Sequence, residues 1–356
     1  MHPFLSRSLS SFSFVLLFVA VVFSSCGGEK LKPFVSFYYW KSNYQLDSTE
    51  RKVLQENNVQ QLYVRYFDIV YDETAKAAIP LAPVHFNKED ILNPIVPVVF
   101  IKNKVFEELD SVAIYNLVDK TVTMLNQINK SVGIKSRALQ IDCDWTSSTA
   151  AKYFYFLKQL REKLDAHEDG GTFASLAMVS ATIRLHQIKY PEKAGIPPVD
   201  KGVLMFYNMG EINNSEVNSI YDQQTSQKYL SSLSAYTLRL DIALPIFAWG
   251  IHMRDGKIVE LLNKMDARDF QNKEEFEQIS ANRYRAVSAF FKNGFYFQAG
   301  DEVKVEEVNE KDFTPMIADL KKSYPNQFQQ VIFYDLDSVN ISRYAKDFYQ
   351  KTVAAF

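Results

Sequence analysis

The sequence predicts an α/β fold, a (β/α)8 barrel with a small α+β insertion after the seventh strand. Two observations support this prediction: short runs of β-branched and aromatic residues recur eight times along the chain, and helical patterns separate them. Eight strands with helical crossovers match a closed TIM barrel, whose parallel strands are buried on both faces. An open doubly wound sheet would show a similar alternation and is the alternative fold.

The expected elements follow each other regularly. The strands lie, in chain order, near residues 34–41, 60–68, 95–102, 138–145, 173–183, 202–209, 239–248 and 329–336. The helical segments lie near 47–57, 108–130, 147–166, 215–234 and 312–323. Asp47 or Ser48 can cap the first helix, and Ser147 or Ser148 can cap the helix after the fourth strand.

Two connections depart from this alternation. Residues 69–94 are expected to form a long loop, because they contain Pro80, Pro83 and Pro94. Residues 250–310 are too long for one crossover helix and are expected to form the insertion within a barrel domain of residues 34–356. Its expected parts are a tight turn at 254–257 (RDGK), a polar helix near 271–290 and a strand-like pair around Gly294 and Gly300.

The N-terminal residues 1–25 are typical of a secretory signal. Arg7 is the only early charge, residues 12–23 are almost wholly apolar, and small residues precede Cys26. The apolar stretch is shorter than the about 20 residues that a membrane-spanning helix needs. An uncleaved anchor or an ordinary signal peptide is the alternative.

Cys26-Gly27-Gly28 resembles the lipidation site of bacterial lipoproteins, in which the cysteine carries lipid and becomes the mature N-terminus. The resemblance implies that residues 26–33 are a lipidated tether and that the lipid anchors the protein in a membrane of the cell envelope. Gly27 provides no acidic retention signal, so we expect the outer membrane. Only Cys143 would remain as a free thiol, and no intrachain disulfide could form.

Composition and motifs exclude several classes of function. The chain has 356 residues, a formal net charge of −2, 47% apolar and 23% charged residues, values that argue against disorder and coiled coil. A near-neutral charge gives no support to nucleic-acid binding. The patterns CxxC, HExxH, GxSxG and GxxxxGK do not occur, so we expect neither a metal site nor a cofactor.

The fourth expected strand carries the strongest candidate site. Side chains alternate along a strand, so Gln140, Asp142 and Asp144 share one face, and the opposite face is apolar. The apolar face suits the helix layer, so the polar face would look into the barrel. Active sites of such barrels lie at the C-terminal strand ends. Neighbouring buried carboxylates raise each other's pKa, which suits a general acid. Alternatively, Asp142 only ties polar layers of the barrel together.

Other expected strand ends add polar and aromatic side chains. His252, as a loop histidine, and Asp337, as a helix N-cap, lie near such ends, and Arg65 could pair with Asp142 or Asp144. Aromatic faces stack on the apolar faces of pyranose rings, so this rim predicts a carbohydrate partner. The further candidate carboxylates are Glu211 and Asp335, and the candidate substrate-binding residues are Tyr39, Trp40, Arg65, Arg184, Tyr207, Asn208, Trp249 and Tyr334.

Four segments in the expected strands carry a resemblance to a known family. They are 141–146 (IDCDWT), 205–208 (MFYN), 243–248 (ALPIFA) and 331–337 (VIFYDLD). In this order they resemble the motifs of the fourth, sixth, seventh and eighth strands of chitinase-like glycoside hydrolases of family eighteen. That family also has an α+β insertion after the seventh strand. The chain further resembles bacterial lipoproteins with glycosidase-like barrels whose function is unknown.

The match to the family's fourth-strand signature, DxxDxDxE, is incomplete. Asp142 and Asp144 stand at its second and third Asp, but Leu139 stands at the first, and Thr146 replaces the Glu. In the family that Glu protonates the leaving oxygen, and the third Asp orients the acetamide of the substrate as nucleophile. A threonine hydroxyl cannot act as a general acid at neutral pH.

Three functions remain open from the sequence. The first is a glycoside hydrolase in which Asp144 takes one carboxylate role and Glu211 or Asp335 takes the other. The second is a catalytically inactive, glycan-binding surface lipoprotein. The third is a structural or assembly lipoprotein with a closed barrel mouth, in which Arg65 neutralises both aspartates.

Overall fold

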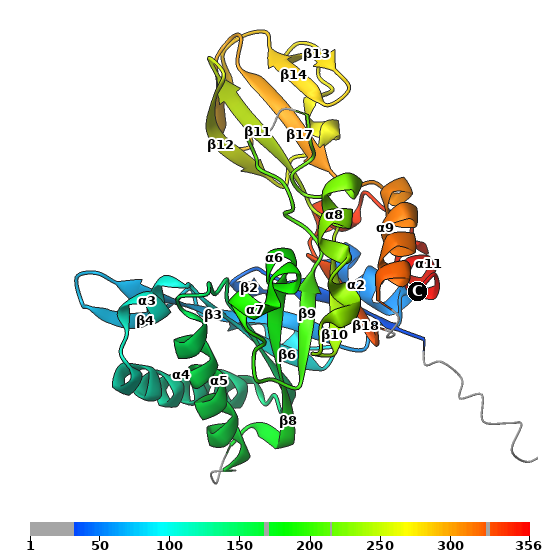
Figure 1. The fold of residues 1–356 in the computed structure, drawn as a ribbon. Helices are drawn as coiled ribbons and strands as arrows, with labels where there is room; N and C mark the ends of the chain where they lie inside the picture. The colour runs from blue at the N-terminus through cyan, green and yellow to red at the C-terminus, as the bar shows by residue number, and fades with distance from the viewer. Residues whose placement is uncertain (1–31, 167–170, 214–215, 325–327) are drawn as a thin grey trace, which may run out of the picture. The chain divides into compact units, whose positions relative to one another are not determined.

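The computed structural model describes residues 32–166, 171–213, 216–324 and 328–356 (Figure 1). The chain divides into two units, and the second unit, Pro33–Phe356, is compact. The predicted signal segment and Cys26 lie outside the described residues. Within the part of the chain that is described, no helix is both long and apolar enough to cross a membrane.

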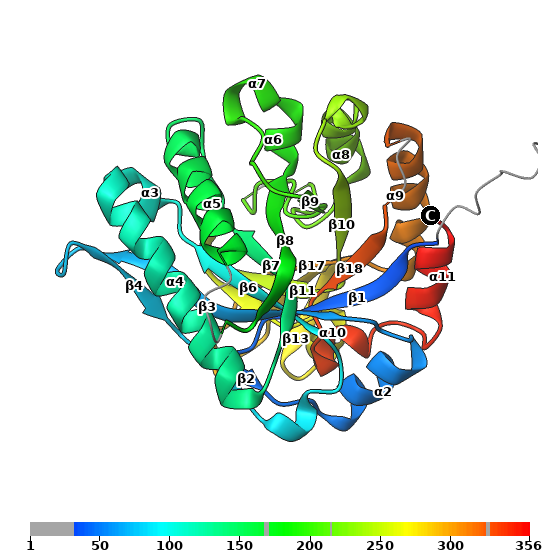
Figure 2. The ribbon, with the colours of Figure 1, turned by 90° about the horizontal axis from the view of Figure 1, so that it is seen from below.

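A closed barrel of eight parallel strands forms the centre of the second unit. β1 pairs with both β18 and β3, which closes the sheet and excludes the open doubly wound alternative. Figure 2 shows the strands converging inside a ring of helices. The barrel strands are β1 (Phe34–Tyr39), β3 (Leu62–Asp72), β6 (Ile95–Ile101), β7 (Ser136–Asp142), β8 (Phe173–Arg184), β9 (Lys201–Met205), β10 (Leu240–Pro245) and β18 (Gln330–Tyr334).

Helices follow the strands and cover the outer face of the barrel. They are α2 (Ser48–Glu56), α3 (Lys104–Glu108), α4 (Ser111–Val132), α5 (Ala150–Asp165), α6 (Leu185–Lys189), α7 (Pro191–Ala194), α8 (Gln223–Leu230), α9 (Glu310–Ser323), α10 (Ser338–Ile341) and α11 (Phe348–Ala354).

The two predicted helix caps have different outcomes. The side chain of Asp47 accepts hydrogen bonds from the backbone of Thr49 and Glu50, so the predicted cap of α2 is confirmed. The cap predicted at Ser147 or Ser148 is wrong. These serines lie in a turn closed by the Ala150 amide donating to the Thr146 carbonyl, and α5 begins only after that turn.

The predicted loop at 69–94 is in part a hairpin. β3 continues to Asp72, and β4 (Ala77–Leu81) returns antiparallel beside it. Pro80 is tolerated because β4 is an edge strand, where a missing N–H leaves no ladder bond unmade. Further on, β5 (His85–Phe86) pairs with β2 (Asn43–Tyr44).

The insertion follows β10, and the predicted turn at 254–257 joins β11 to β12. The secondary structure differs from the prediction at 271–290. The sheet of the insertion has the order β12-β11-β17-β14-β13, and a separate hairpin is formed by β15 and β16. No helix lies at 271–290 among the described residues, because alternate side chains of that stretch, such as Phe276 and Tyr284, pack into a small core with Phe297. The strands are β11 (Ala248–Arg254), β12 (Lys257–Asn263), β13 (Phe276–Ser280), β14 (Arg283–Ala286), β15 (Phe290–Lys292), β16 (Phe295–Phe297) and β17 (Glu302–Glu307).

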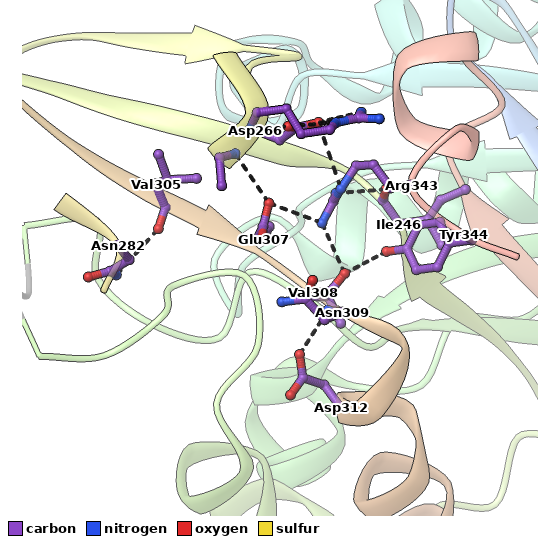
Figure 3. Close-up of polar contacts among 12 residues, drawn as sticks. Ile246, Asp266, Asn282, Val305, Glu307, Val308, Asn309, Asp312, Arg343 and Tyr344 are labelled. Atoms are coloured by element: carbon purple, nitrogen blue, oxygen red, sulfur yellow. Dashed lines mark hydrogen bonds and ion pairs between the residues drawn. The ribbon is translucent and has the colours of Figure 1, made fainter. Parts of the chain in front are cut away.

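Arg343 fastens the insertion to the barrel (Figure 3). Its guanidinium donates to the carbonyl of Ile246, where the chain enters the insertion, at 3.3 Å, and to that of Val308, where the chain leaves it, at 3.1 Å. The same group lies 3.5 Å from Glu307 and 3.9 Å from Asp266. One buried cation therefore joins both crossings between the insertion and the barrel.

The interior of the barrel contains a hydrogen-bonded polar layer. The Tyr38 hydroxyl donates to Gln140 at 2.7 Å, and the Tyr63 hydroxyl donates to Gln330 at 2.9 Å. Gln330 in turn donates to Ser36 at 2.5 Å. Gln140 thus faces into the barrel. The side chains that follow it on β7 approach the C-terminal ends of the strands, and we call this end of the barrel the barrel mouth.

Candidate functional site

Two adjoining pockets occupy the barrel mouth. The larger pocket, of about 640 Å³, is bordered by the insertion and the ends of β1 and β18. The smaller pocket, of about 300 Å³, lies over β8 and α6. Asn208 lines both pockets, so they adjoin at the end of β9. The closed mouth expected for a purely structural protein is therefore absent from the described residues.

The two aspartates of the fourth barrel strand have different environments. Asp142 is buried and accepts a hydrogen bond from the Thr182 hydroxyl at 2.6 Å. Burial raises the pKa of Asp142, although the Arg184 charge and the Thr182 bond oppose this effect. The Asp144 side chain is 54% exposed and lines the smaller pocket. Of this pair, only Asp144 is open to a ligand.

Arg184, at the end of β8, holds both carboxylates. Its Nε donates to Asp144 in an ion pair, and its Nη2 lies 3.8 Å from Asp142. The register between β7 and β8 produces this contact, because residues 140 and 141 pair with residues 180 and 181. The same offset of 40 residues brings 142 beside 182 and 144 beside 184.

The suggested pairing of Arg65 with these aspartates is wrong. Arg65 instead makes a two-fold contact with Asp68, at 2.7 Å and 2.6 Å. Residues three apart on a regular strand point to opposite faces. An irregularity in β3 between Arg65 and Phe67 puts both side chains on the same side. Arg65 lines the larger pocket, and Asp68 already neutralises its positive charge.

Thr146 lies in a turn, and its side chain cannot serve as a general acid. Its hydroxyl lies 2.8 Å from that of Ser148, and its backbone amide donates to the Thr149 hydroxyl at 2.9 Å. The preceding Trp145 is fully buried, donates to the Ala194 carbonyl at 2.8 Å and stacks on Tyr153. This segment therefore anchors the end of the strand.

Aromatic rings form one wall of the larger pocket. Tyr334 is central: its ring centroid lies 5.6 Å from Trp40, 5.8 Å from Phe247 and, in a stacked arrangement, 5.3 Å from Tyr207. Trp249 extends the wall from the insertion, and its Nε1 donates to buried Glu306 at 2.9 Å. These rings are already held in place before any ligand arrives.

The two aspartates after the eighth barrel strand have pKa values that are shifted in opposite directions. Burial, reinforced by the negative charge of Asp337, raises the pKa of Asp335 to about 6, and Lys264 and Lys41 only partly oppose this. Asn340 donates to Asp335 at 2.6 Å. Burial would also raise the pKa of Asp337, but Lys264 at 2.7 Å and Lys41 at 3.1 Å hold it below its ordinary value. Asp337 caps α10, as predicted.

Some predicted residues lie apart from the two pockets. Glu211 is exposed and is not among the residues that line them. Tyr39 is buried against Tyr44, and its hydroxyl donates to the Asn43 carbonyl at 2.8 Å. His252 is no loop residue: it is buried within β11 and hydrogen-bonded to Asp301 at 2.9 Å. The structure gathers the other candidates, which are Trp40, Arg65, Asp144, Arg184, Tyr207, Asn208, Trp249, Tyr334 and Asp335, around the pockets.

Several residues that line the pockets were not predicted from the sequence. Phe247 directly follows the seventh strand, so its position could have revealed it. Lys264 comes from the insertion and Tyr229 from α8, and no local pattern signals either of them. Among the described residues, no group of three or more His, Cys, Asp or Glu side chains could hold a metal ion.

Comparison with solved structures relates this fold to known enzymes. The chain is similar to the spore cortex-lytic enzyme SleL of Bacillus cereus, at 14% identity and a TM-score of 0.53, over 91% of this chain and 75% of that one. The chitinase of Chromobacterium violaceum is similar at 11% identity and a TM-score of 0.54, over 91% and 98% of the two chains. The GH18 chitinase of Cycas revoluta, solved with (GlcNAc)3, is similar at 11% identity and a TM-score of 0.56. The match covers 90% of this chain and 98% of that one.

No protein-family model matches this chain, and no curated protein sequence matches it. At these low identities the structural likeness concerns the fold, which is the chitinase-like (β/α)8 barrel that the sequence motifs predicted.

Proposed function

We propose that this protein binds glycans at the barrel mouth and does not hydrolyse them by the mechanism of the chitinase-like enzymes. The observation that carries the proposal is the larger pocket, with its wall of Trp40, Phe247, Trp249 and Tyr334. Rings fixed in advance offer apolar faces to pyranose rings at a small cost in side-chain entropy. The similar Cycas revoluta chitinase, solved with (GlcNAc)3, supports an N-acetylated glycan as the first ligand to test.

The chemistry of the aspartate pair argues against the family's mechanism. Thr146 supplies no proton to a leaving oxygen. Arg184 occupies Asp144 and approaches Asp142. A substrate acetamide would have to share the Asp144 carboxylate with that guanidinium, which already occupies its Oδ1. Binding without turnover fits this arrangement.

Binding and turnover can be separated in one experiment. The purified protein is titrated calorimetrically with (GlcNAc)4, and the mixture is then examined by mass spectrometry for shortened products. Trp249→Ala should weaken binding about tenfold or more, since the ring contributes to the aromatic wall. Tyr115→Ala is the matched control, because Tyr115 is an exposed aromatic residue on α4 that lines neither pocket of the mouth. Equal affinity of the wild type and Trp249→Ala would contradict the proposal.

Hydrolysis through a relocated acid is the second candidate. It is favoured by Asp335, whose pKa of about 6 keeps part of the carboxyl protonated near neutral pH. Asp335 would then protonate the leaving oxygen, with Asp144 as the second carboxylate. Shortened products that disappear in Asp335→Asn, with binding retained, would establish this candidate and overturn binding without turnover.

For location, we propose a lipid anchor at Cys26 that holds the protein in the outer membrane of a bacterial envelope. The support is the sequence around the cysteine, with a short apolar stretch before it and glycine after it. Incorporation of labelled palmitate into the wild type, and its loss in Cys26→Ala, would support the anchor. Equal labelling of both forms would contradict it. Fractionation of the labelled protein into inner or outer membrane tests the destination.

A further inference from the structure

The smaller pocket extends from the barrel mouth over the start of α6 and reaches α8. Tyr229 of α8 lines the pocket, and α8 packs against α6. The Nζ atom of Lys189, at the end of α6, lies 5.2 Å from the centre of the Tyr229 ring. The Tyr229 side chain therefore lies between the Lys189 ammonium group and the pocket.

Two lysines surround the next aromatic ring on this path. Lys189 and Lys193 each place Nζ 5.5 Å from the centre of the Tyr190 ring, and Tyr190 is 44% exposed. We call Lys189, Tyr190, Lys193 and Tyr229 the α6–α7 platform. The rings hold the ammonium groups by cation–π contacts, so less side-chain freedom is lost when a ligand binds them.

Among the described residues, no acidic side chain forms an ion pair with the lysines of the platform, Lys189 and Lys193. Glu192 is the acidic residue between them and is exposed. His186 adds no charge at neutral pH, because burial lowers its pKa. In the adjoining pocket, by contrast, Arg184 is already occupied by Asp144. The unpaired positive charge thus lies at the outer end of the path.

We propose that the α6–α7 platform binds the carboxylate groups of an acidic glycan whose chain continues from the barrel mouth. This inference rests on the proposed glycan binding and specifies the ligand class. A sugar in the mouth pockets places the next units of the chain over Tyr229. An acid group on those units then meets Lys189 and Lys193, whereas a carboxylate near Asp144 would be repelled.

The test compares acidic oligosaccharides with their uncharged counterparts. The probes are a hyaluronan hexasaccharide and a hexagalacturonate, each beside the same molecule with its carboxyl groups reduced to alcohols. Binding to the purified protein is measured by calorimetry at low and high salt. The variants are Lys189→Gln, Lys193→Gln and the double variant. Lys130→Gln is the control, since Lys130 is an exposed lysine in the last turn of α4, at the opposite end of the barrel.

We expect at least one acidic probe to bind more tightly than its reduced form. Each lysine substitution should reduce that preference about two- to fivefold, the range of exposed ion pairs, and high salt should reduce it further. The reduced probe should bind the double variant and the wild type equally, and Lys130→Gln should change nothing.

Two results would overturn the inference, and they differ in what they say of the proposed function. If neither acidic probe is preferred, or the double variant keeps the preference, the platform has no such role. Binding of (GlcNAc)4 that is weakened by Trp249→Ala would still uphold the mouth as a glycan site in that case. If none of these oligosaccharides binds, both proposals are wrong.

Discussion

Arg184 forms an ion pair with Asp144 at the rim of the barrel and lies 3.8 Å from buried Asp142. One guanidinium from β8 thus serves two carboxylates of the adjacent strand segment. Taking it away would leave Asp142 buried with Thr182 as its remaining hydrogen-bond donor. Stability and the state of the candidate site are therefore linked through this arginine.

Replacing Arg184 by Met should lower the free energy of unfolding at pH 7 by about 1–3 kcal/mol, since a charged buried group loses its partner. The pKa of Asp142 is already raised by burial, and it would rise further without the cation. Protonation of Asp142 removes the cost of burying its unpaired charge. The loss of stability in Arg184→Met should therefore shrink as the pH falls toward 4. Urea denaturation at both pH values measures this. Arg137→Met, at an exposed position, should show no such change, and a pH-independent loss in Arg184→Met would contradict the prediction.

Asp335→Asn should stabilise the protein at neutral pH. A pKa raised from 3.8 to about 6 means that the charged carboxylate is penalised in the folded state by about 3 kcal/mol. The unfolded chain loses its proton first, so wild-type stability falls as the pH rises from about 4 to about 6. The gain in Asp335→Asn should be full above pH 6.5 and absent near pH 4, by chemical denaturation.

Asp337→Asn is the control of opposite sign. The pKa of Asp337 is lowered in the folded protein, so its charged form stabilises the fold above the ordinary carboxyl pKa. This variant should lose stability at neutral pH, and the loss should diminish in acid. If Asp335→Asn and Asp337→Asn changed the free energy of unfolding in the same direction, the opposite pKa shifts of these two aspartates would be contradicted.

Thr146→Glu should not by itself produce hydrolysis. The substitution puts a carboxyl where the family has its acid, but Arg184 still engages Asp144. The position is exposed, so stability should change by about 0.5 kcal/mol or less. Mass spectrometry of (GlcNAc)4 incubated with this variant should show intact sugar. Shortened products would instead mean that the ion pair opens readily and that Thr146 was the main obstacle.

Arg343→Met should loosen the insertion. The substitution removes two hydrogen bonds to the chain crossings and leaves Glu307 and Asp266 without a shared cation (Figure 3). We expect a loss of about 2–4 kcal/mol and faster proteolysis within residues 248–307. Arg285→Met is the matched control, because its ion pair with Glu302 is exposed and should contribute under about 1 kcal/mol. Equal proteolysis of the two variants would contradict this role.

Local patterns in the sequence were enough to predict the barrel and its candidate strand ends. The eight strand runs and the alternation that turns Gln140 inward both follow from residues close together in the chain. The insertion shows where such patterns fail. The polar stretch at 271–290 was expected to be helical, yet Phe276 and Tyr284 form strands because their partners lie in other strands of the insertion.

Tertiary structure alone decided which charges meet. From the sequence, Arg65 was the expected partner of Asp142 or Asp144, and Arg184 was a candidate substrate-binding residue. The irregularity in β3 turned Arg65 toward Asp68, and the register of β7 against β8 placed Arg184 beside Asp144. Periodicity along one strand sets the face of a side chain. The partner of that side chain depends on the offset between two strands, which only the closed barrel determines.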